Sequence, residues 1–320
     1  MTQLLVRRGL AALLLIWIVA SCAFLLTALA PGDVADVTGG IGARTPERLA
    51  AMRAEAGLDR PLLVQYGAWL GRVVRGDLGT SFLYRAPVGP MVLDRATNTA
   101  ILAVAALLLA LVIGLPPAVL CATRPRSIAA RAVRALSLLL LSIPPFVGAL
   151  VLVLVAARTG WLPAGGMTSG ADLSGAAWLA DLLWHLPLPA LALALPLAAT
   201  FERQQSTALA EALATPAVQA ARARGVGDGQ IVRRHAWRLS LKPVLALGGL
   251  AMAALLGGAF VVETIAAWPG LGRLTHDALR ARDIPLVAGC ALAGSTVLAI
   301  GLFISDLLIA WSDPRTRAEA

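Results

Sequence analysis

The chain has 320 residues, of which 58% are hydrophobic and only 14% are charged, and its formal net charge is +9 at neutral pH. This composition excludes a soluble globular protein with a normally charged surface and indicates a polytopic membrane protein. The three cysteines, Cys22, Cys121 and Cys290, lie far apart in apolar runs, so neither a disulfide framework nor a cysteine metal site is expected.

Six apolar stretches are long enough to cross a bilayer as helices, which takes roughly 20 residues each. They lie at about 9–30, 96–121, 135–157, 186–207, 243–266 and 286–310. The first stretch follows Arg7 and Arg8 as a secretory signal would, but its length favours a retained span. We therefore predict an all-α membrane protein with six transmembrane helices in a single domain over residues 1–320.

The distribution of arginine predicts the orientation of these spans. An even number of spans puts both termini on the same side. Arginines cluster before the first span, between the second and third, within 220–242 and near the C-terminus, whereas the 159–183 loop has none. The positive-inside rule then places both termini in the cytoplasm. The loop with Arg273, Arg280 and Arg282 is the exception to this pattern.

The first outer loop, 31–95, is long enough to carry structure of its own. Thr45 can cap a helix that has a proline at its first position, and Gly57 can end that helix. The segment "PLLVQYGAWLGRVV" adds Tyr66 and Trp69 beside apolar neighbours, as expected of an interfacial segment. The loop is either a covering lid or a docking surface.

Prolines and small residues inside the stretches predict kinked and closely packed helices. The prolines are Pro116, Pro117, Pro144, Pro145, Pro187, Pro189 and Pro196. Membrane helices tolerate proline where neighbours satisfy the freed carbonyl groups. In the fifth stretch, Gly249, Ala253 and Gly257 recur every four residues, a spacing that lets two helix backbones approach closely, within a bundle or across a dimer.

Catalytic and metal-binding patterns are missing from the sequence. The histidines, His185, His235 and His276, fall at span ends or in loops, with no HExxH spacing and no paired carboxylates. Ser169 lies in a glycine-rich loop, where an intramembrane serine protease would not place its nucleophile. We therefore expect no catalytic residues, no metal and no cofactor, which disfavours an intramembrane enzyme.

Three acidic residues, Glu202, Glu263 and Asp306, are candidates for buried charges. Each lies toward the end of a predicted span, where a charge costs less than at the bilayer centre. Pairing with an arginine and a place on a transport path are both open. The run "GVGDG" at 225–229 lacks the Gly-Lys-Ser/Thr ending of a phosphate loop, so any ATP is hydrolysed by another chain.

The region 220–243 is basic, with six arginine or lysine residues against the single acid Asp228. It suits an anionic membrane surface, a nucleic acid or a soluble protein partner. Nucleic-acid binding lacks interleaved aromatic residues. Contact with the membrane surface stays an alternative, mainly for the outer arginines. A helical face of small residues favours insertion into the cleft of another protein. That face is predicted from Ala217, Ala220, Ala221 and Gly225, at i, i+3, i+4 and i+8.

The stretch "AARARGVGDGQIVRRHAWRLSLKPVLALGGL" resembles the cytoplasmic coupling loop of ABC importer permeases, specifically the first, B-type permease of the oligopeptide, dipeptide and nickel group. Residues 221–225 match the Ala-Arg-Ala-Lys-Gly core of that loop with arginine for lysine, and "RHA" at 234–236 matches its second half. The likeness extends through "LAPGDVAD", "SIPPF", "VVETIAAWPGLGRL", "RDIPLVAG" and "SDPRTR". One departure is Ala217, where the family often has an aromatic residue.

The resemblance implies a passive half-channel of the bacterial inner membrane, with the ABC importer permease fold. Its partners would be ATP-binding subunits, a second homologous permease and an extracytoplasmic solute-binding protein on the side of the 31–95 loop. The cytoplasmic loop 208–242 would seat in the ATPase. The implied coupling residues are Ala217, Ala220, Ala221, Arg222, Arg224, Gly225, Arg234 and His235. Di- or oligopeptides are the expected cargo, with nickel or a metal chelate as the alternative.

Overall fold

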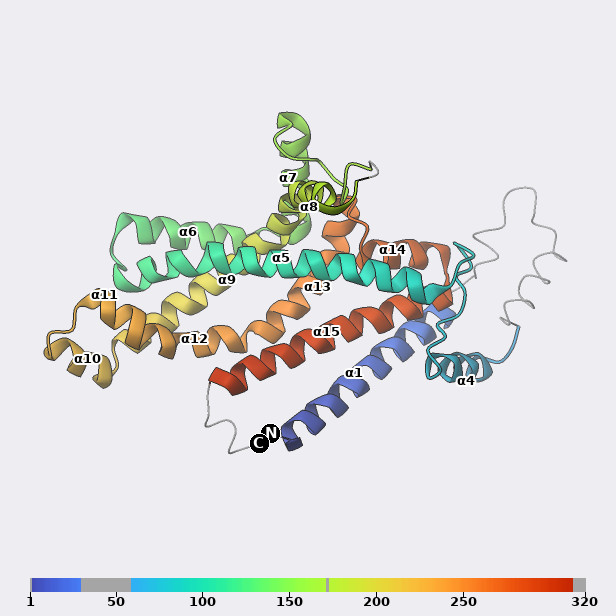
Figure 1. The fold of residues 1–320 in the computed structure, drawn as a ribbon, viewed down its shortest axis with the longest axis horizontal. Coiled ribbons are helices and arrows are strands. Elements are labelled where there is room, and N and C mark those ends of the chain that lie inside the picture. Colours follow the sequence, from blue (N-terminus) through green and yellow to red (C-terminus); the bar gives the residue numbers. More distant parts are fainter. Residues whose placement is uncertain (1, 30–58, 171–172, 313–320) are drawn as a thin grey trace. The chain divides into compact units, whose positions relative to one another are not determined.

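The computed structural model of the chain describes residues 2–29, 59–170 and 173–312, and the regular elements in these ranges are helices (Figure 1). The helix expected between Thr45 and Gly57 lies outside the described residues. Contacts divide the chain into two compact units. Unit 1 comprises Met1–Leu4, Ile101–Trp268 and Ile300–Ala320, and unit 2 comprises Leu5–Ala100 and Pro269–Ala299.

Most helices belong to one unit. Unit 1 contains α6 (Ile128–Ser142), α7 (Pro145–Thr159), α8 (Gly175–His185), α9 (Pro187–Leu213), α10 (Pro216–Ala223), α11 (Asp228–Gln230), the π-helix η1 (Ile231–Ala236), α12 (Trp237–Ala246) and α13 (Gly248–Ile265). Unit 2 contains α4 (Leu62–Val73) and α14 (Leu271–Ala281). Residues of both units occur in α1 (Thr2–Leu29), α5 (Val88–Thr123) and α15 (Ile284–Ser312).

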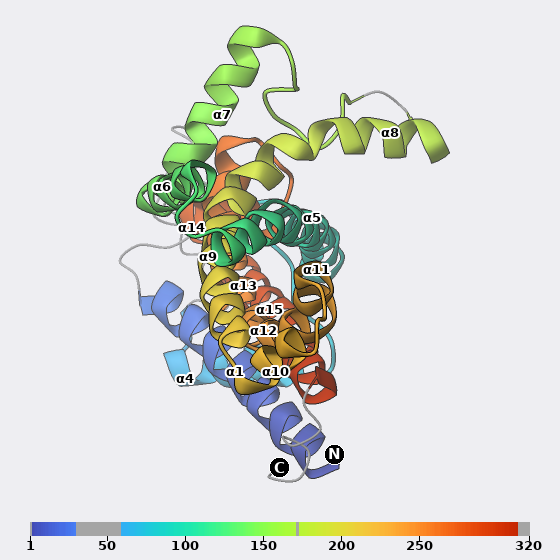
Figure 2. The same ribbon diagram turned by 90° about the vertical axis from the view of Figure 1, so that its left-hand side faces the viewer.

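Four helical stretches are long and apolar enough to cross a membrane by themselves. They are Val6–Leu29, Val88–Thr123, Gly248–Ile265 and Ile284–Leu308. Two further candidates are bent pairs, α6 with α7 at 103° and α8 with α9 at 46° (Figure 2). The described residues therefore fit four to six spans by length and composition, and the six-span topology stays a prediction.

Proline determines the sharper of these bends. Ile143 has an extended backbone, with φ −89° and ψ 118°, because the ring of Pro144 disfavours the helical region for the residue before it. The stretch expected as one span at 135–157 is therefore divided, with Pro145 opening the next helix. By contrast, α5 continues through Pro116 and Pro117 over all of its 36 residues.

The core of unit 1 forms around α9, which packs against α6, α7, α12 and α13. Small side chains make this packing close, since Ala190, Ala194 and Ala198 are all essentially buried. A Cβ added to Gly114 of α5 would lie 2.5 Å from the carbonyl oxygen of Ala198. The helix backbones therefore approach at a distance that admits no side chain at residue 114.

In unit 2, an aromatic cluster joins α1 to α4. The ring of Phe24 stacks on Trp69 with centroids 5.0 Å apart, and the Tyr66 ring lies 5.8 Å from both. The hydroxyl groups of Tyr66 and Ser21 are hydrogen bonded at 2.8 Å. Trp69 is buried within the chain by these contacts. The interfacial placement of this segment stays a prediction.

A single buried carboxylate, that of Asp283, holds the 79–88 loop against the start of α15 in unit 2. One of its oxygens accepts hydrogen bonds from the Ser81 hydroxyl at 2.6 Å and the Leu83 amide at 2.9 Å. The other accepts from the Leu286 amide at 3.1 Å, which makes Asp283 the N-cap of α15. The side chain is fully buried, so it satisfies three donors out of contact with solvent.

Replacing Asp283 by alanine is expected to destabilise unit 2, because three buried donors lose their acceptor. Hydrogen bonds to charged groups contribute roughly 1.5–3 kcal/mol each, so the free energy of unfolding should fall by at least about 3 kcal/mol. Thermal unfolding of the purified protein in detergent measures the change. Asp94→Ala, at a side chain that is 70% exposed, is the control. Equal melting temperatures for the two variants would contradict the capping role.

Candidate functional site

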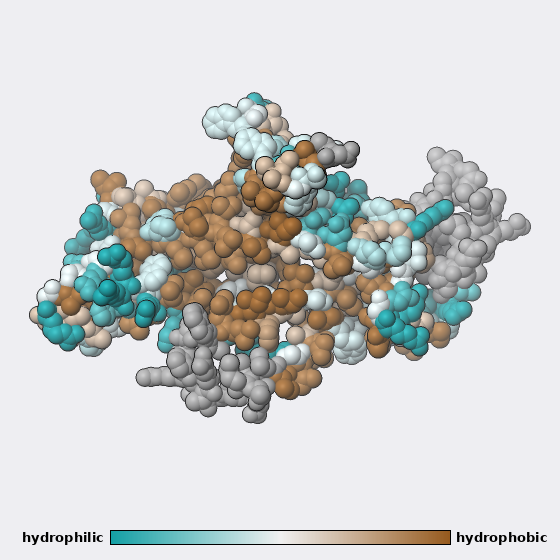
Figure 3. Space-filling model, viewed as in Figure 1, coloured by the Kyte–Doolittle hydropathy of each residue, from teal (hydrophilic) through white to brown (hydrophobic). Residues whose placement is uncertain are grey.

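The segment that joins α9 to α12, residues 214–236, is the candidate site, and we call it the coupling segment. It consists of α10, α11 and η1 in succession. Hydrophilic side chains gather over α10 and α11, beside a predominantly hydrophobic surface over α5 and α9 (Figure 3). The segment therefore has the polarity of a part that lies outside the apolar body of unit 1.

The short helix α10 turns two of its eight residues inward. Val218 and Ala221 are 1% and 2% exposed, and they lie three residues apart on the same face. Ala217, Ala220 and Ala223 are exposed. The expected face shared by Ala217, Ala220, Ala221 and Gly225 is therefore split, because Ala221 is needed for packing within the chain. Of the small residues predicted to form that face, Ala217 and Ala220 are the ones on α10 that a partner can approach.

Gly225 ends α10 with a left-handed backbone. Its φ is +80°, its amide donates to the Arg222 carbonyl at 3.0 Å, and the Val226 amide donates to the Ala221 carbonyl at 3.2 Å. This pair of hydrogen bonds is the Schellman motif, in which glycine avoids the steric cost of positive φ. A Cβ at Gly225 would meet no atom of the chain within 4 Å, so conformation and not space requires glycine here.

The basic residues of the segment are mostly exposed, and one of them has an acidic partner within it. Arg222 contacts Asp228 through Nη2 at 3.1 Å and Nε at 3.2 Å, which closes the turn after α10. The two side chains are 50% and 80% exposed, so the pair contributes only about 0.2–1 kcal/mol. Arg224 is exposed as well. A carboxylate on a partner would therefore have to compete with Asp228 for Arg222.

The π-helix η1 fixes the second half of the coupling segment. Ile231 and Ala236 at its two ends are fully buried. Ala236 belongs to an apolar cluster with Leu209 and Ala212 of α9. The "RRH" residues between them, 233–235, are all exposed. Arg234 and His235 are thus presented outward from a turn whose ends are held by packing, and π-helical turns occur frequently at functional sites.

Two buried polar residues of α9 were not fully anticipated from the sequence. Glu202 accepts a hydrogen bond from the Ser137 hydroxyl of α6 at 2.7 Å, instead of the arginine partner considered for it. Gln205 donates to the Ser240 hydroxyl of α12 at 2.8 Å and is fully buried. The sequence feature that could have indicated this pair is the spacing of three residues between Glu202 and Gln205, which puts both on one face of a helix that is otherwise apolar on that face.

Of the three residues predicted for helix packing, one contacts a neighbouring helix and two are exposed. A Cβ on Gly249 would lie 2.8 Å from Leu302 of α15, whereas Ala253 and Gly257 are exposed. Other glycines also make close contacts at α13. Gly248 approaches Ser305, Gly258 approaches Leu193, and Gly301 of α15 approaches Met252. Within this chain, Ala253 and Gly257 are therefore available to lipid or to another subunit.

The described residues contain no constellation suited to catalysis or metal binding. The Ser169 hydroxyl donates to the Asp181 carboxylate at 2.5 Å, and His185 Nδ1 lies 3.5 Å from the same carboxylate oxygen. The serine is thus bonded to the acid and not to the imidazole that would have to deprotonate it. No group of three metal-ligating side chains occurs in the ranges that the structure describes.

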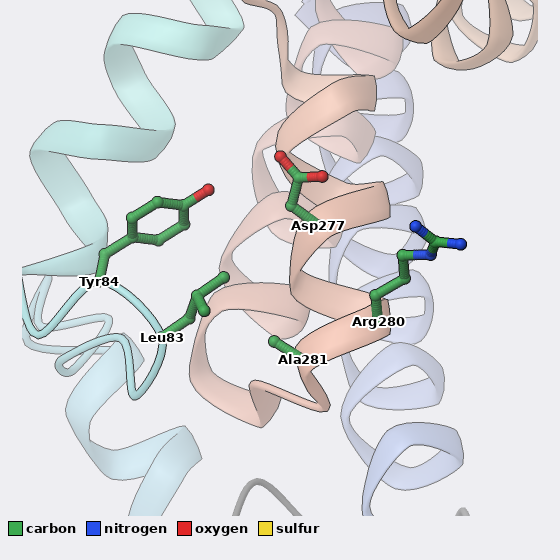
Figure 4. Close-up of a pocket in the computed structure, with 5 residues that line it drawn as sticks. All are labelled: Leu83, Tyr84, Asp277, Arg280 and Ala281. Atoms are coloured by element: carbon green, nitrogen blue, oxygen red, sulfur yellow. The ribbon is translucent and has the colours of Figure 1, made fainter. Parts of the chain in front are cut away.

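A depression of about 380 Å³ lies in unit 2, beside the loop that Asp283 holds (Figure 4). It is lined by Leu83, Tyr84, Asp277, Arg280 and Ala281. Burial and then the Asp277 carboxylate raise the pKa of Tyr84, so its phenol stays neutral at physiological pH. The polar groups that line the depression are the phenol of Tyr84, the carboxylate of Asp277 and the guanidinium of Arg280. They include no nucleophile in contact with a base, so the depression suits a polar contact surface.

Two protein-family models together match nearly the whole chain. Residues 114–318 match the model described as binding-protein-dependent transport system inner membrane component. Residues 1–103 match the model of the N-terminal region of such membrane components.

Curated relatives align over almost their full length. The chain is 37% identical over 299 residues to a putative peptide permease protein of Brucella ovis, which covers 92% of each chain. It is 32% identical to the oligopeptide transport system permease protein AppB of Bacillus subtilis, over 98% of this chain and 99% of the relative. The dipeptide transport system permease protein DppB of Escherichia coli is 33% identical over 92% of each chain.

Replacing Gly225 by valine should loosen the end of α10, because a β-branched residue is strained at positive φ. A penalty of about 1–2 kcal/mol corresponds to roughly 5–30-fold faster amide exchange at residues 225 and 226. Hydrogen-exchange mass spectrometry measures this difference. Gly227→Val is the matched control, since Gly227 is exposed and has an ordinary φ of −64°. Equal exchange in both variants would contradict the capping role of Gly225.

Proposed function

The chain belongs to the family of binding-protein-dependent transport system inner membrane components, and from this we propose that it forms half of the translocation path of an ATP-driven importer for di- or oligopeptides. It is a permease of a binding-protein-dependent peptide transport system, a multi-pass inner membrane protein and not an enzyme. The observation that carries the proposal is the nearly full-length similarity to peptide permeases.

Peptides are favoured over nickel as the cargo. The relatives described above are named for peptides, oligopeptides and dipeptides. No cluster of histidine, cysteine or acidic side chains in the described residues is suited to hold a metal ion. A chelated metal needs no such cluster, so a nickel or metal-chelate permease is the second candidate.

The coupling segment is proposed to dock in a groove of an ATP-hydrolysing subunit. Ala217 and Ala220 are exposed and present nearly bare backbone, and Arg224, Arg234 and His235 of the same segment are exposed and carry positive charge or hydrogen-bond donors. Ala221 and Gly225 hold α10 in shape from within. Closure of the ATPase subunits would move the segment as a lever, and the chain itself would carry out no bond chemistry.

Further partners follow from the same proposal. The arginine distribution supports cytoplasmic termini, with the 31–95 region on the outer side, where a solute-binding protein would deliver cargo. A second homologous permease would complete the path. The exposed Ala253 and Gly257 on α13 are the small residues proposed for the contact with that permease or with lipid.

Ala220→Trp is expected to weaken binding of the ATPase subunit by steric overlap at the docking face. Overpacking typically costs about 1–3 kcal/mol, which corresponds to roughly 5–150-fold weaker binding. Co-purification of ATPase subunits with the tagged chain from its native membrane measures the effect. Ala132→Trp, at an exposed alanine of α6, is the control. Retention of the ATPase at the level of the control would contradict docking through this face.

Cargo is tested by uptake in cells that lack this chain and in cells that express it again. A peptide importer predicts that uptake of labelled di- or oligopeptides is lost and restored, while uptake of labelled nickel is unchanged. Only peptide uptake should change, because the translocation path carries only the cargo that the solute-binding protein delivers to it. Loss of nickel uptake together with intact peptide uptake would establish the second candidate instead.

A further inference from the structure

We propose that the hydrogen bond between Gln205 of α9 and Ser240 of α12 transmits movement of the coupling segment to the transmembrane helices. This inference rests on the proposed function, because it concerns how a docked segment moves the rest of unit 1. Gln205 and Ser240 are positioning residues in this role. They contact neither the cargo nor the ATPase.

The bond joins the two helices from which the coupling segment emerges. The segment leaves α9 after Leu213 and enters α12 at Trp237. Gln205 Nε2 donates to Ser240 Oγ at 2.8 Å, and the two side chains are 0% and 1% exposed. The bond therefore joins α9 and α12 close to the points where residues 214–236 leave one helix and enter the other. A force on the coupling segment would act on both helices together.

An apolar cluster fills the space between this bond and the coupling segment. Leu209 and Ala212 of α9 pack with Ala236, the last residue of η1. Val119 of α5 and Trp237 of α12 lie against the same cluster. Movement of η1 is thus passed through packed side chains, which have little free volume to absorb it.

A second buried bond continues the linkage from α9 to α6. Glu202, one turn before Gln205, accepts from the Ser137 hydroxyl at 2.7 Å. Glu202 is 2% and Ser137 5% exposed. Since α9 is bonded to α12 through Gln205 and to α6 through Glu202, a displacement of the coupling segment shifts three helices and not one.

Stability alone does not account for these polar residues in the apolar interior. Gln205 Oε1 and Glu202 Oε1 are both buried, and neither has a hydrogen-bond partner in the structure. An apolar side chain of similar shape would carry no such unpaired acceptor, and exchanging a buried polar pair for apolar residues is often neutral or stabilising. What the polar pair adds is a directional contact, because a hydrogen bond weakens steeply when its donor and acceptor move out of line, so it holds α12 in one register against α9.

The experiment uses the complex of this chain with its ATPase subunits and second permease in proteoliposomes, with and without the cargo-loaded binding protein. Gln205→Met keeps the length of the side chain and removes the bond, and it leaves Ser240 still donating to the Trp237 carbonyl at 3.0 Å. Gln204→Met, at the adjacent exposed glutamine, is the matched control. Ser240→Ala and the double variant complete the cycle, and Ser240→Thr retains the hydroxyl.

The inference predicts that Gln205→Met assembles normally and keeps its basal ATP hydrolysis. Stimulation by the loaded binding protein, and cargo uptake with it, should fall at least about fivefold, the lower end of typical coupling between sites. The double variant should lose no more than either single variant, because one bond is removed in all three. Gln204→Met should behave as the unmodified complex, and Ser240→Thr should keep more of the stimulation than Ser240→Ala because it retains the hydroxyl.

Full stimulation in an assembled Gln205→Met complex would overturn the inference, as would additive losses in the double variant. If Gln205→Met failed to assemble, loss of stimulation in Ser240→Ala with recovery in Ser240→Thr would support the bond, and unchanged stimulation in Ser240→Ala would overturn it. If the unmodified chain did not bind ATPase subunits, the proposed function would be refuted. This outcome is seen in the same preparation and is distinct from a failure of the inference about Gln205 and Ser240.

Discussion

Close packing around α9 is the contact on which the rest of unit 1 depends. Its alanines let α5 approach until the Gly114 position has no room for a side chain, and α6, α7, α12 and α13 pack on the remaining sides. In a bilayer there is no hydrophobic driving force between helices, so association relies on van der Waals contact and interhelical hydrogen bonds. The short distances between α9 and its neighbours are also what bring Glu202 to Ser137 and Gln205 to Ser240.

The coupling segment illustrates how a short element is held without a core of its own. An eight-residue helix is too short to be stable in water alone, so α10 depends on packing and caps. Val218 and Ala221 anchor one side of it, the Schellman hydrogen bonds at Gly225 end it, and Ile231 anchors the next turn. These constraints leave the opposite side of α10 free to contact a partner without loss of local structure.

Much of the fold could be predicted from hydrophobicity, because an apolar run of about 20 residues has few alternatives to a membrane helix. The charge and the small residues of 214–236 singled this segment out in the sequence, and its role in coupling stays a prediction. Two further details required the structure. The division of the third stretch at Ile143 depends on the local conflict between Pro144 and the helix, and the burial of Trp69 depends on the approach of Phe24 from α1.

The sequence by itself determined an all-α membrane protein, its family and the segment through which it is proposed to meet an ATPase, because composition, periodicity and ordered motifs are properties of the chain alone. Tertiary structure alone decided which alanines of α10 face outward, which residue partners Glu202, and that Gln205 and Ser240 meet. These outcomes depend on how helices distant in sequence are rotated against one another, and a helical pattern specifies which residues share a face but not which neighbour that face will contact.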